Sequence, residues 1–316
     1  MKKILAIVLA LTAMNALFAQ QEPQFTMFMF NKLAYNPAYA GSTEAPCMTA
    51  TYRNQWLGLE GAPQVQMISF QLPLMHQRIG VGGNIMRNTI GISEFYTADA
   101  AYAYRLKLGR GFLGIGMQAS VRFLQNDYRK ATAIQAGDDA IPGSMQSKYV
   151  PNFGAGLYYH TEKFYVGASA PRLLQNNIDL GDEERILSRE VQHFYVMGGL
   201  VIKLADQFKL SPQVLLKYVD GAPFDADASL GFIFYDRFTV GAAYRLGGST
   251  VSGAGESLDF ILAAQLTNQL MFAASYDYTL SDLRTQNTGS VEVALRFCLG
   301  GKKQEGEEEY VNPRFF

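Results

Sequence analysis

Histidine, cysteine and serine–histidine–aspartate groupings are the side chains that most often carry catalysis or bind metals, and this chain offers little of that chemistry. It has three histidines and two cysteines in 316 residues, too few and too scattered for a metal site. His76, His160 and His193 fall on different predicted strands or connections. No serine has the spacing of a nucleophile elbow, and no glycine-rich phosphate loop opens a helix. We therefore predict a protein that is not an enzyme and needs no cofactor.

The first residues have the pattern of an export signal. Lys2 and Lys3 provide a positive start, and an apolar run and a cleavage site before Gln20 follow. The run is shorter than the roughly 20 apolar residues of a membrane-spanning helix. We therefore predict a signal peptide at 1–19 and a mature chain outside the cytoplasm. The formal net charge of −1 gives no reason to expect nucleic acid as a partner.

The dominant pattern in the mature chain has a period of two. In "FLGIGMQASVRF" (Phe112–Phe123), apolar residues such as Leu113 and Ile115 alternate with Gly114, Gly116 and polar residues. Alternation over this length indicates a long β-strand with two unlike faces. Fourteen segments can be read in this way, near 47–55, 65–72, 78–87, 93–107, 111–124, 150–161, 163–171, 191–204, 207–218, 225–235, 237–246, 256–267, 269–279 and 288–299.

The connections between these segments alternate in length. The even-numbered ones are very short, while the odd-numbered ones are generally longer, and the longest are 125–149 and 172–190. Transmembrane β-barrels of the outer membrane have short periplasmic turns and longer external loops. We therefore predict an all-β fold, an antiparallel transmembrane barrel of about 14 strands in the outer membrane, in contact with its lipid. An even strand count also predicts that both termini are periplasmic.

A soluble β-sandwich is the alternative, because it too has alternating strands. Here the apolar face is continuous and aromatic, and tyrosines gather near strand ends as in an interfacial belt: Tyr96, Tyr102, Tyr104, Tyr158, Tyr159, Tyr218, Tyr235, Tyr276 and Tyr278. The opposite face has only single charges, where a sandwich exposes many more: Asp99, Arg105, Arg122, Lys217, Arg237, Arg245, Asp259, Asp277 and Arg296. These features favour the membrane barrel.

The predicted layout has four parts: signal peptide 1–19, N-terminal segment 20–46, barrel 47–299 and periplasmic tail 300–316. The N-terminal segment is rich in Phe, Met and Tyr, and leaving each large apolar side chain in water is unfavourable by about 1.5–3 kcal/mol. Two locations are open for it. It is either a plug inside the barrel mouth or a docking surface for a periplasmic partner, and we place its start on the periplasmic side.

Two motifs in this region resemble a known family. "QEPQFTMFMFNKLAYNPAYAGS" (Gln21–Ser42) and "YRNQWLGLEGAP" (Tyr52–Pro63) resemble the PorP/SprF family, outer-membrane proteins of the type IX secretion system in Bacteroidetes-type bacteria. The resemblance is most specific at Asn36, Pro37, Tyr39, Gly41, Arg53, Gln55 and Trp56, and the "NPRFF" ending with Arg314, Phe315 and Phe316 is similar too. It implies a role in secretion and, in some members, gliding motility. Partners implied are a secreted adhesin or its C-terminal domain, and periplasmic type IX components.

Several of these residues also have a physical interpretation. Arg53 shares the lumenal face with Thr49 and Thr51, where it either anchors carboxylates or carbonyls or pairs with a lumenal acid such as Asp99. Trp56 is either an anchor in the interfacial belt or a stacking surface for a ligand. Arg122 and Arg245 complete the predicted lumenal binding residues.

The two ends of the predicted barrel and its longest loops suggest further contacts. Strands one and fourteen meet where a barrel closes, so Cys47 and Cys298 are either disulfide-bonded neighbours or two free thiols. The tail is either a flexible extension or, through its aromatic end, a docking segment. The acidic residues of 172–190 either stay solvated or meet a basic patch or a divalent cation.

Three functions remain compatible with these features. The first is a non-enzymatic barrel that anchors secreted surface proteins and links to the secretion or gliding machinery. The second is a passive porin or a channel for hydrophobic compounds, and the third is a purely structural attachment point.

Overall fold

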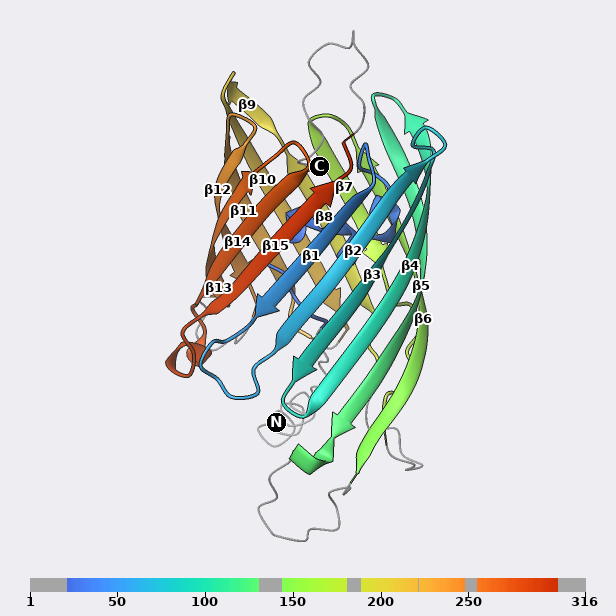
Figure 1. Cartoon of the computed structure of the whole chain (residues 1–316), viewed down its shortest axis with the longest axis vertical. Helices are drawn as coiled ribbons and strands as arrows, with labels where there is room; N and C mark the ends of the chain where they lie inside the picture. The colour runs from blue at the N-terminus through green and yellow to red at the C-terminus, as the bar shows by residue number, and fades with distance from the viewer. Residues whose placement is uncertain (1–21, 131–143, 181–188, 221, 248–254, 301–316) are drawn as a thin grey trace, which may run out of the picture.

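Figure 1 shows a computed structural model of the chain, in which a tilted β-barrel surrounds an irregular segment. The structure describes residues 22–130, 144–180, 189–220, 222–247 and 255–300. The predicted signal peptide, the tail after Gly300 and parts of the longest connections lie outside the described residues. Within the described residues, no helix has the length and apolar character needed to cross a membrane.

The described strands follow the predicted alternation closely. They are β1 (Cys47–Asn54), β2 (Gln64–Leu74), β3 (Ile79–Ile90), β4 (Ser93–Leu108), β5 (Gly111–Asp127), β6 (Met145–His160), β7 (Phe164–Ala170), β8 (His193–Leu200), β9 (Ile202–Ala205), β10 (Phe208–Val219), β11 (Asp225–Phe234), β12 (Phe238–Leu246), β13 (Ser257–Gln265), β14 (Leu270–Thr279) and β15 (Ser290–Cys298). The predicted boundaries differ most at β6, which begins at Met145 instead of 150.

All of these strands form one antiparallel sheet that closes on itself. β1 pairs with β15 over its whole length, from Cys47 opposite Cys298 to Asn54 opposite Val291. β8 and β9 both pair with β10 and are separated by Val201, so together they form one interrupted strand. Counting β8 and β9 as one, the described strands therefore form a barrel wall of fourteen strands, as predicted. Closure matters because a sheet in lipid has no water to satisfy an open edge.

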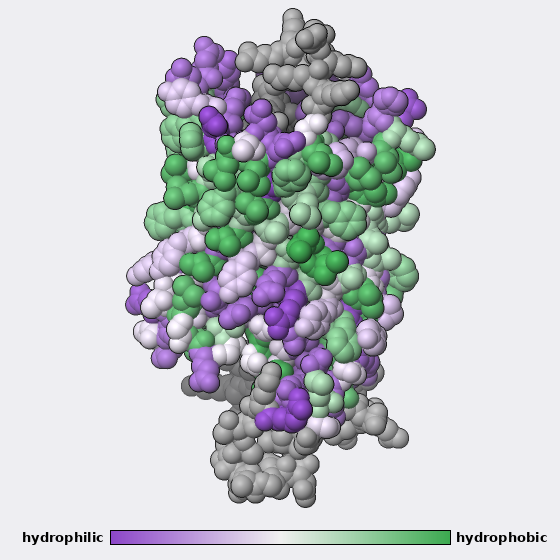
Figure 2. All heavy atoms as spheres, viewed as in Figure 1, coloured by the Kyte–Doolittle hydropathy of each residue, from purple (hydrophilic) through white to green (hydrophobic). Residues whose placement is uncertain are grey.

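The two faces of the barrel wall have opposite character. Burial alternates residue by residue, as at the start of β13, where Asp259 and Ile261 face inward while Phe260 and Leu262 are exposed. Figure 2 shows hydrophobic residues gathered in a band across the visible face, with hydrophilic residues towards the ends of the barrel. The apolar face is thus the outer surface, as expected of a wall in lipid.

Two individual sequence assignments are wrong. Tyr158, predicted for the interfacial belt, is 1% exposed and points into the lumen, because its position on β6 has inward parity. Arg237, predicted on the inner face of a strand, lies in the exposed turn between β11 and β12. Both residues stand near strand ends, where a shift of one residue reverses the side that a side chain faces.

The N-terminal segment runs through the lumen. It contains three short 3-10 helices, η1 (Phe28–Phe30), η2 (Lys32–Ala34) and η3 (Pro37–Tyr39), drawn in blue inside the barrel in Figure 1. We call residues 22–46 the plug. Its Glu22 end lies beside the long connections, near Asn126 and Asp179. Its Gly41 end lies beside Gly80, close to the short turns.

We expected the segment to start on the periplasmic side, at the end of the barrel where β1 begins, but its first described residue, Glu22, lies beside the long connections. Because the number of strands is even, β1 begins and β15 ends at the same end of the barrel. This rule does not constrain a segment that crosses the lumen. The predicted periplasmic location of both termini concerns residues outside the described ones, and it stays a prediction.

Candidate functional site

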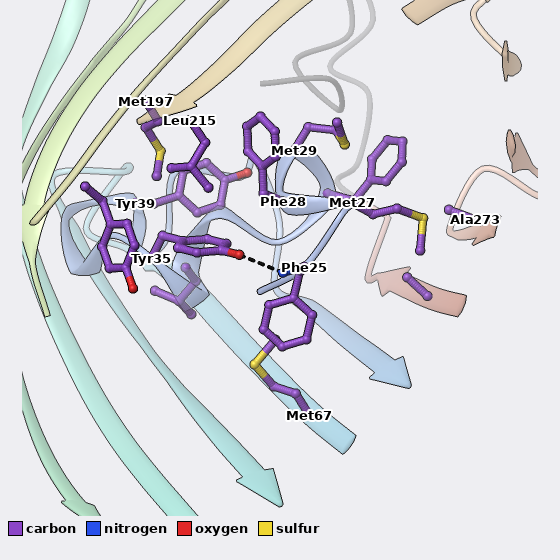
Figure 3. Packing of buried hydrophobic residues seen from close by; sticks show 14 of the residues in the cluster. Phe25, Met27, Phe28, Met29, Tyr35, Tyr39, Met67, Met197, Leu215 and Ala273 are labelled. Carbon is purple, nitrogen blue, oxygen red and sulfur yellow. Dashed lines mark hydrogen bonds between the residues drawn. The ribbon is translucent and has the colours of Figure 1, made fainter. Parts of the chain in front are cut away.

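The hydrophobic residues of the plug form the main buried cluster of the barrel (Figure 3). Phe25, Met27 and Phe28 are each at most 5% exposed and pack with wall residues such as Met67, Met197 and Leu215. The rings of Phe25 and Tyr35 meet edge to face, and the Phe25 N–H donates to the Tyr35 hydroxyl at 3.0 Å. Burial within the lumen therefore explains why this segment is rich in large apolar side chains.

The part of the wall against which the plug lies carries a row of inward-facing glycines, which we call the glycine track. A Cβ atom on Gly80 would overlap the Ala40 carbonyl oxygen, and one on Gly116 would overlap the backbone of Ala38. A Cβ atom on Gly114 would lie 2.7 Å from the Ala38 carbonyl oxygen. The plug backbone therefore lies flat against β3 and β5, at a distance that only glycine allows.

The Asn36–Gly41 motif is shaped to fit that track. The Asn36 side chain caps η3 by accepting from the Ala38 N–H at 2.9 Å, and its amide donates to the Leu157 carbonyl of β6 at 2.9 Å. Pro37 starts η3, where its missing N–H leaves no partner unsatisfied. Gly41 has φ of +61°, and Arg105 of β4 donates to its carbonyl oxygen. The motif turns the chain and ties it to the wall.

Arg53 connects the plug with the strands at the barrel seam. Its guanidinium is 2.7 Å from Asp277 of β14 and 3.1 Å from Glu292 of β15, and all three side chains are at most 3% exposed. The Thr26 hydroxyl donates to Asp277 at 2.8 Å and accepts from Arg53 at 3.0 Å. Glu292 accepts the backbone N–H groups of Thr26 and Met27 at 2.8 and 3.2 Å.

Arg245 enters the same network from β12. It lies 2.7 Å from Asp227 and donates to the Thr26 hydroxyl at 3.2 Å. Lys217 of β10 holds the other Asp227 oxygen at 2.8 Å. Of the two expectations for Arg53, the structure thus shows pairing with lumenal acids, but these are Asp277 and Glu292. The acid named as an example, Asp99, lies on β4 and is 3.9 Å from Arg172.

A second ion-pair group holds the first described residue of the plug. Glu22 forms ion pairs with Arg122 of β5 and with Arg172, the latter at 2.6 Å. Burial opposes ionisation of Glu22, but the attraction of Arg122, Arg172 and His193 more than offsets it and holds its pKa well below the usual value. Glu190 is one of the acidic residues of 172–190 for which solvation, a basic patch or a divalent cation was expected. It lies 3.3 Å from Arg122 and is 3% exposed.

Lys32 is a fully buried basic residue inside the plug. Its ammonium donates to the Met29 carbonyl at 3.0 Å and lies 4.5 Å from the centre of the Tyr165 ring and 5.4 Å from that of Tyr39. Lys32 lies outside the strands that span the membrane. Burial, and then the nearby Arg296, lower its pKa to about 7.

The predicted binding residues thus fall into two sets. The first set contacts the plug or belongs to it, and comprises Asn36, Pro37, Tyr39, Gly41, Arg53, Arg122 and Arg245. The second set does not: Gln55 donates its N–H to Pro63 in the β1–β2 connection, and half-buried Trp56 donates its N–H to Ser290. Arg314, Phe315 and Phe316 lie outside the described residues.

The two cysteines meet where the barrel closes. Cys47 and Cys298 are opposite each other in the β1–β15 register, with 4.1 Å between their Cα atoms, and a disulfide joins them. The bond links residues separated by 251 positions and lies at the end of the barrel that carries the short turns. It covalently closes the ring of strands at its seam.

Sequence reasoning missed Glu22, Thr26, Lys32, Arg172 and Glu292 as parts of the site. Alternation placed Glu292 on the inner face, and this signal was available. The remaining four lie in irregular segments without a period, so no local pattern indicates their direction. Within the described residues, no group of three or more His, Cys, Asp or Glu side chains is arranged to hold a metal ion.

Comparisons with known proteins agree with this architecture. The family model described as "Type IX secretion system membrane protein PorP/SprF" matches residues 17–297. No curated protein shows significant similarity to the chain.

Similar solved structures include the CymD monoaromatic hydrocarbon channel, with TM-score 0.51, 12% identity, and coverage of 88% of this chain and 94% of that chain. The Acinetobacter baumannii outer membrane protein Omp33 has TM-score 0.49 and 9% identity, with 82% of this chain and 100% of that chain covered. The CymD likeness supports the barrel fold alone.

Proposed function

The chain belongs to the PorP/SprF family of type IX secretion system membrane proteins, and on this premise we propose that it binds secreted surface proteins at the outer membrane. In this proposal the protein is not an enzyme. It anchors an adhesin or an adhesin's C-terminal domain, and it links that cargo to periplasmic components of the secretion or gliding machinery.

The observation that carries this proposal is the filled lumen. A barrel of fourteen strands has more interior space than an eight-stranded one, whose side chains fill it. Here the plug occupies that space, with Phe28, Lys32 and Leu33 each 1% exposed. A plug tied by buried ion pairs favours a binding role over open conduction.

The two ends of the barrel offer different surfaces for partners. At the end with the long connections, a cavity of about 580 Å³ reaches down to Glu22 and Arg122. We assign this end to the exported protein. We assign the end with the short turns, together with the tail, to the periplasmic machinery, which agrees with the usual orientation of outer-membrane barrels.

Purification from native membranes in a gentle detergent tests the proposal. We expect a surface adhesin or its C-terminal domain to co-purify, and mass spectrometry identifies it. Recovery of periplasmic components alone would favour a purely structural attachment point instead.

A channel for hydrophobic compounds is the second candidate. A small pocket of about 30 Å³ lies between Met29 and Phe30 of the plug and Gly231, Gly241 and Ile261 of the wall, so the plug does not fill the lumen completely there. The similarly folded CymD is named as a monoaromatic hydrocarbon channel. Steady open channels in planar bilayers, or saturable uptake of such compounds by liposomes containing the protein, would favour this candidate.

A further inference from the structure

A cavity with polar and apolar lining lies between the Glu22 end of the plug and the long connections. It has a volume of about 580 Å³ and is lined by inward residues of β3, β4 and β5 and by the connection before β8. Its apolar side includes Phe95, Leu124, Ile178 and Leu180, which belong to one small cluster. A cavity of this size, with a few convergent polar groups, is typical of a ligand site.

Two arginines converge at the base of this cavity. Arg122 lines it directly, and Arg172 lies beside it and shares the Glu22 carboxylate with Arg122. The buried Nε atom of Arg122 has no hydrogen-bond partner among the described residues. The guanidinium fork of arginine suits a carboxylate, which accepts two parallel N–H bonds. The pair therefore has the chemistry of a carboxylate site, and a carboxylate of the chain itself already occupies it.

Glu22 is the more replaceable of the acidic partners. Its side chain is 14% exposed, whereas that of Glu190 is 3% exposed and also accepts from Asn152 at 2.6 Å and Asn176 at 3.2 Å. The backbone of Glu22 makes one long hydrogen bond, from its N–H to His193 at 3.4 Å. The next plug side chain that bonds to the wall is Gln24, which donates to Asp225 at 2.8 Å, and the buried ion-pair network begins at Thr26. Glu22 can therefore leave the arginines while the rest of the plug stays in place.

We propose that Arg122 and Arg172 form a carboxylate-binding subsite which Glu22 fills in the free protein and which a carboxylate of an exported polypeptide takes over. The structure supports a polypeptide source, because the carboxylate now bound is carried by an irregular, non-helical stretch of chain. The apolar cluster beside the arginines then receives side chains next to that carboxylate. This inference rests on the proposed function, since it specifies how the exported partner is recognised.

The test measures binding of a short fluorescent peptide with leucines next to a free C-terminal carboxylate. The same peptide with a C-terminal amide is the control ligand, and both are titrated against detergent-solubilised full-length protein. A hydrogen bond to a charged group contributes about 1.5–3 kcal/mol, so we expect the carboxylate peptide to bind roughly tenfold to a hundredfold more tightly than the amide. Equal binding of both peptides overturns the proposal.

Two variants locate the binding on these side chains. Glu22→Gln removes the internal competitor and should tighten carboxylate binding, while Arg122→Gln should abolish the preference for carboxylate over amide. Glu94→Gln is the matched control, because Glu94 pairs with the exposed Arg87 at the wall and is not among the residues lining the cavity. Heat-modifiable gel mobility confirms that each variant is folded, and Arg122→Lys replaces Arg122→Gln if the latter does not fold.

A third experiment tests whether the bound carboxylate comes from a polypeptide or from a lipid. Decanoate is titrated against the Glu22→Gln variant, and binding of decanoate without binding of the peptide overturns the polypeptide source. Co-purification of an adhesin with a wild-type protein that shows no carboxylate preference would leave the proposed function intact and reject this subsite. The opposite pair of results would retain the subsite and reject the proposed function.

Discussion

Gly80 of β3 and Ala40 of the plug are so close that the wall has no room for a side chain between them. The same is true of Gly116 and Ala38 on β5. The Asn36–Gly41 motif therefore fits against the wall because the wall has glycines there, as much as because of the side chains of the plug. This relationship makes the plug an integral part of the barrel interior, and it leads to the first prediction.

Gly116→Ala should loosen the plug. The new methyl group would overlap the Ala38 backbone, and overpacking of this kind typically destabilises by about 1–3 kcal/mol. We expect a lower unfolding midpoint in urea and a higher conductance in planar bilayers. Gly231→Ala is the matched control, because its Cβ would be 3.3 Å from the Thr239 side chain, which has space to move. Equal behaviour of the two variants would show that the glycine track does not hold the plug.

Arg53→Met should be much more damaging than the loss of a surface ion pair. It leaves Asp277 and Glu292 buried without their main cation, and breaking a buried pair in this way costs about 3–5 kcal/mol. Arg87→Met, which breaks the exposed pair with Glu94, should change stability by about 0–1 kcal/mol. Urea unfolding of both variants in detergent measures the difference. Similar losses would mean that the Arg53 network is not structurally important.

Removal of the seam disulfide should weaken closure of the barrel. We expect the Cys47→Ser/Cys298→Ser double variant to lose about 2–4 kcal/mol of stability, although hydrogen bonds between β1 and β15 remain. Thermal unfolding followed on non-reducing gels measures this. Reduction of the wild type should reproduce the effect, and two alkylatable thiols in the untreated native protein would contradict the bond.

Lys32 should make stability depend on pH. Its folded pKa of about 7 lies below the ordinary lysine pKa of 10.5, so between these values the unfolded chain holds a proton that the folded protein has lost. Stability must therefore rise with pH across that window, by up to about 1.4 kcal/mol per pH unit, and be lowest below pH 7. Lys32→Met should remove this slope. Denaturation of both proteins at several pH values tests it, and parallel curves would refute it.

Local sequence information is sufficient for the direction of side chains along a strand. Alternation in Phe112–Phe123 correctly predicted which residues of β5 face lipid, because successive side chains of any strand point to opposite sides. The count of fourteen alternating segments correctly predicted the number of strands around the closed barrel. The interruption of β8 at Val201 was missed, because periodicity continues across it.

The sequence by itself therefore determined the barrel, its two faces and the residues that line its interior, because these follow from backbone geometry within each strand. Only the tertiary structure decided which interior residues meet. Thr26 and Glu292 are 266 positions apart, yet the Thr26 N–H donates to the Glu292 carboxylate at 2.8 Å. Such contacts depend on barrel closure and on the path of the plug through the lumen, and hydrogen bonds and Coulomb attraction act through space, independently of separation along the chain.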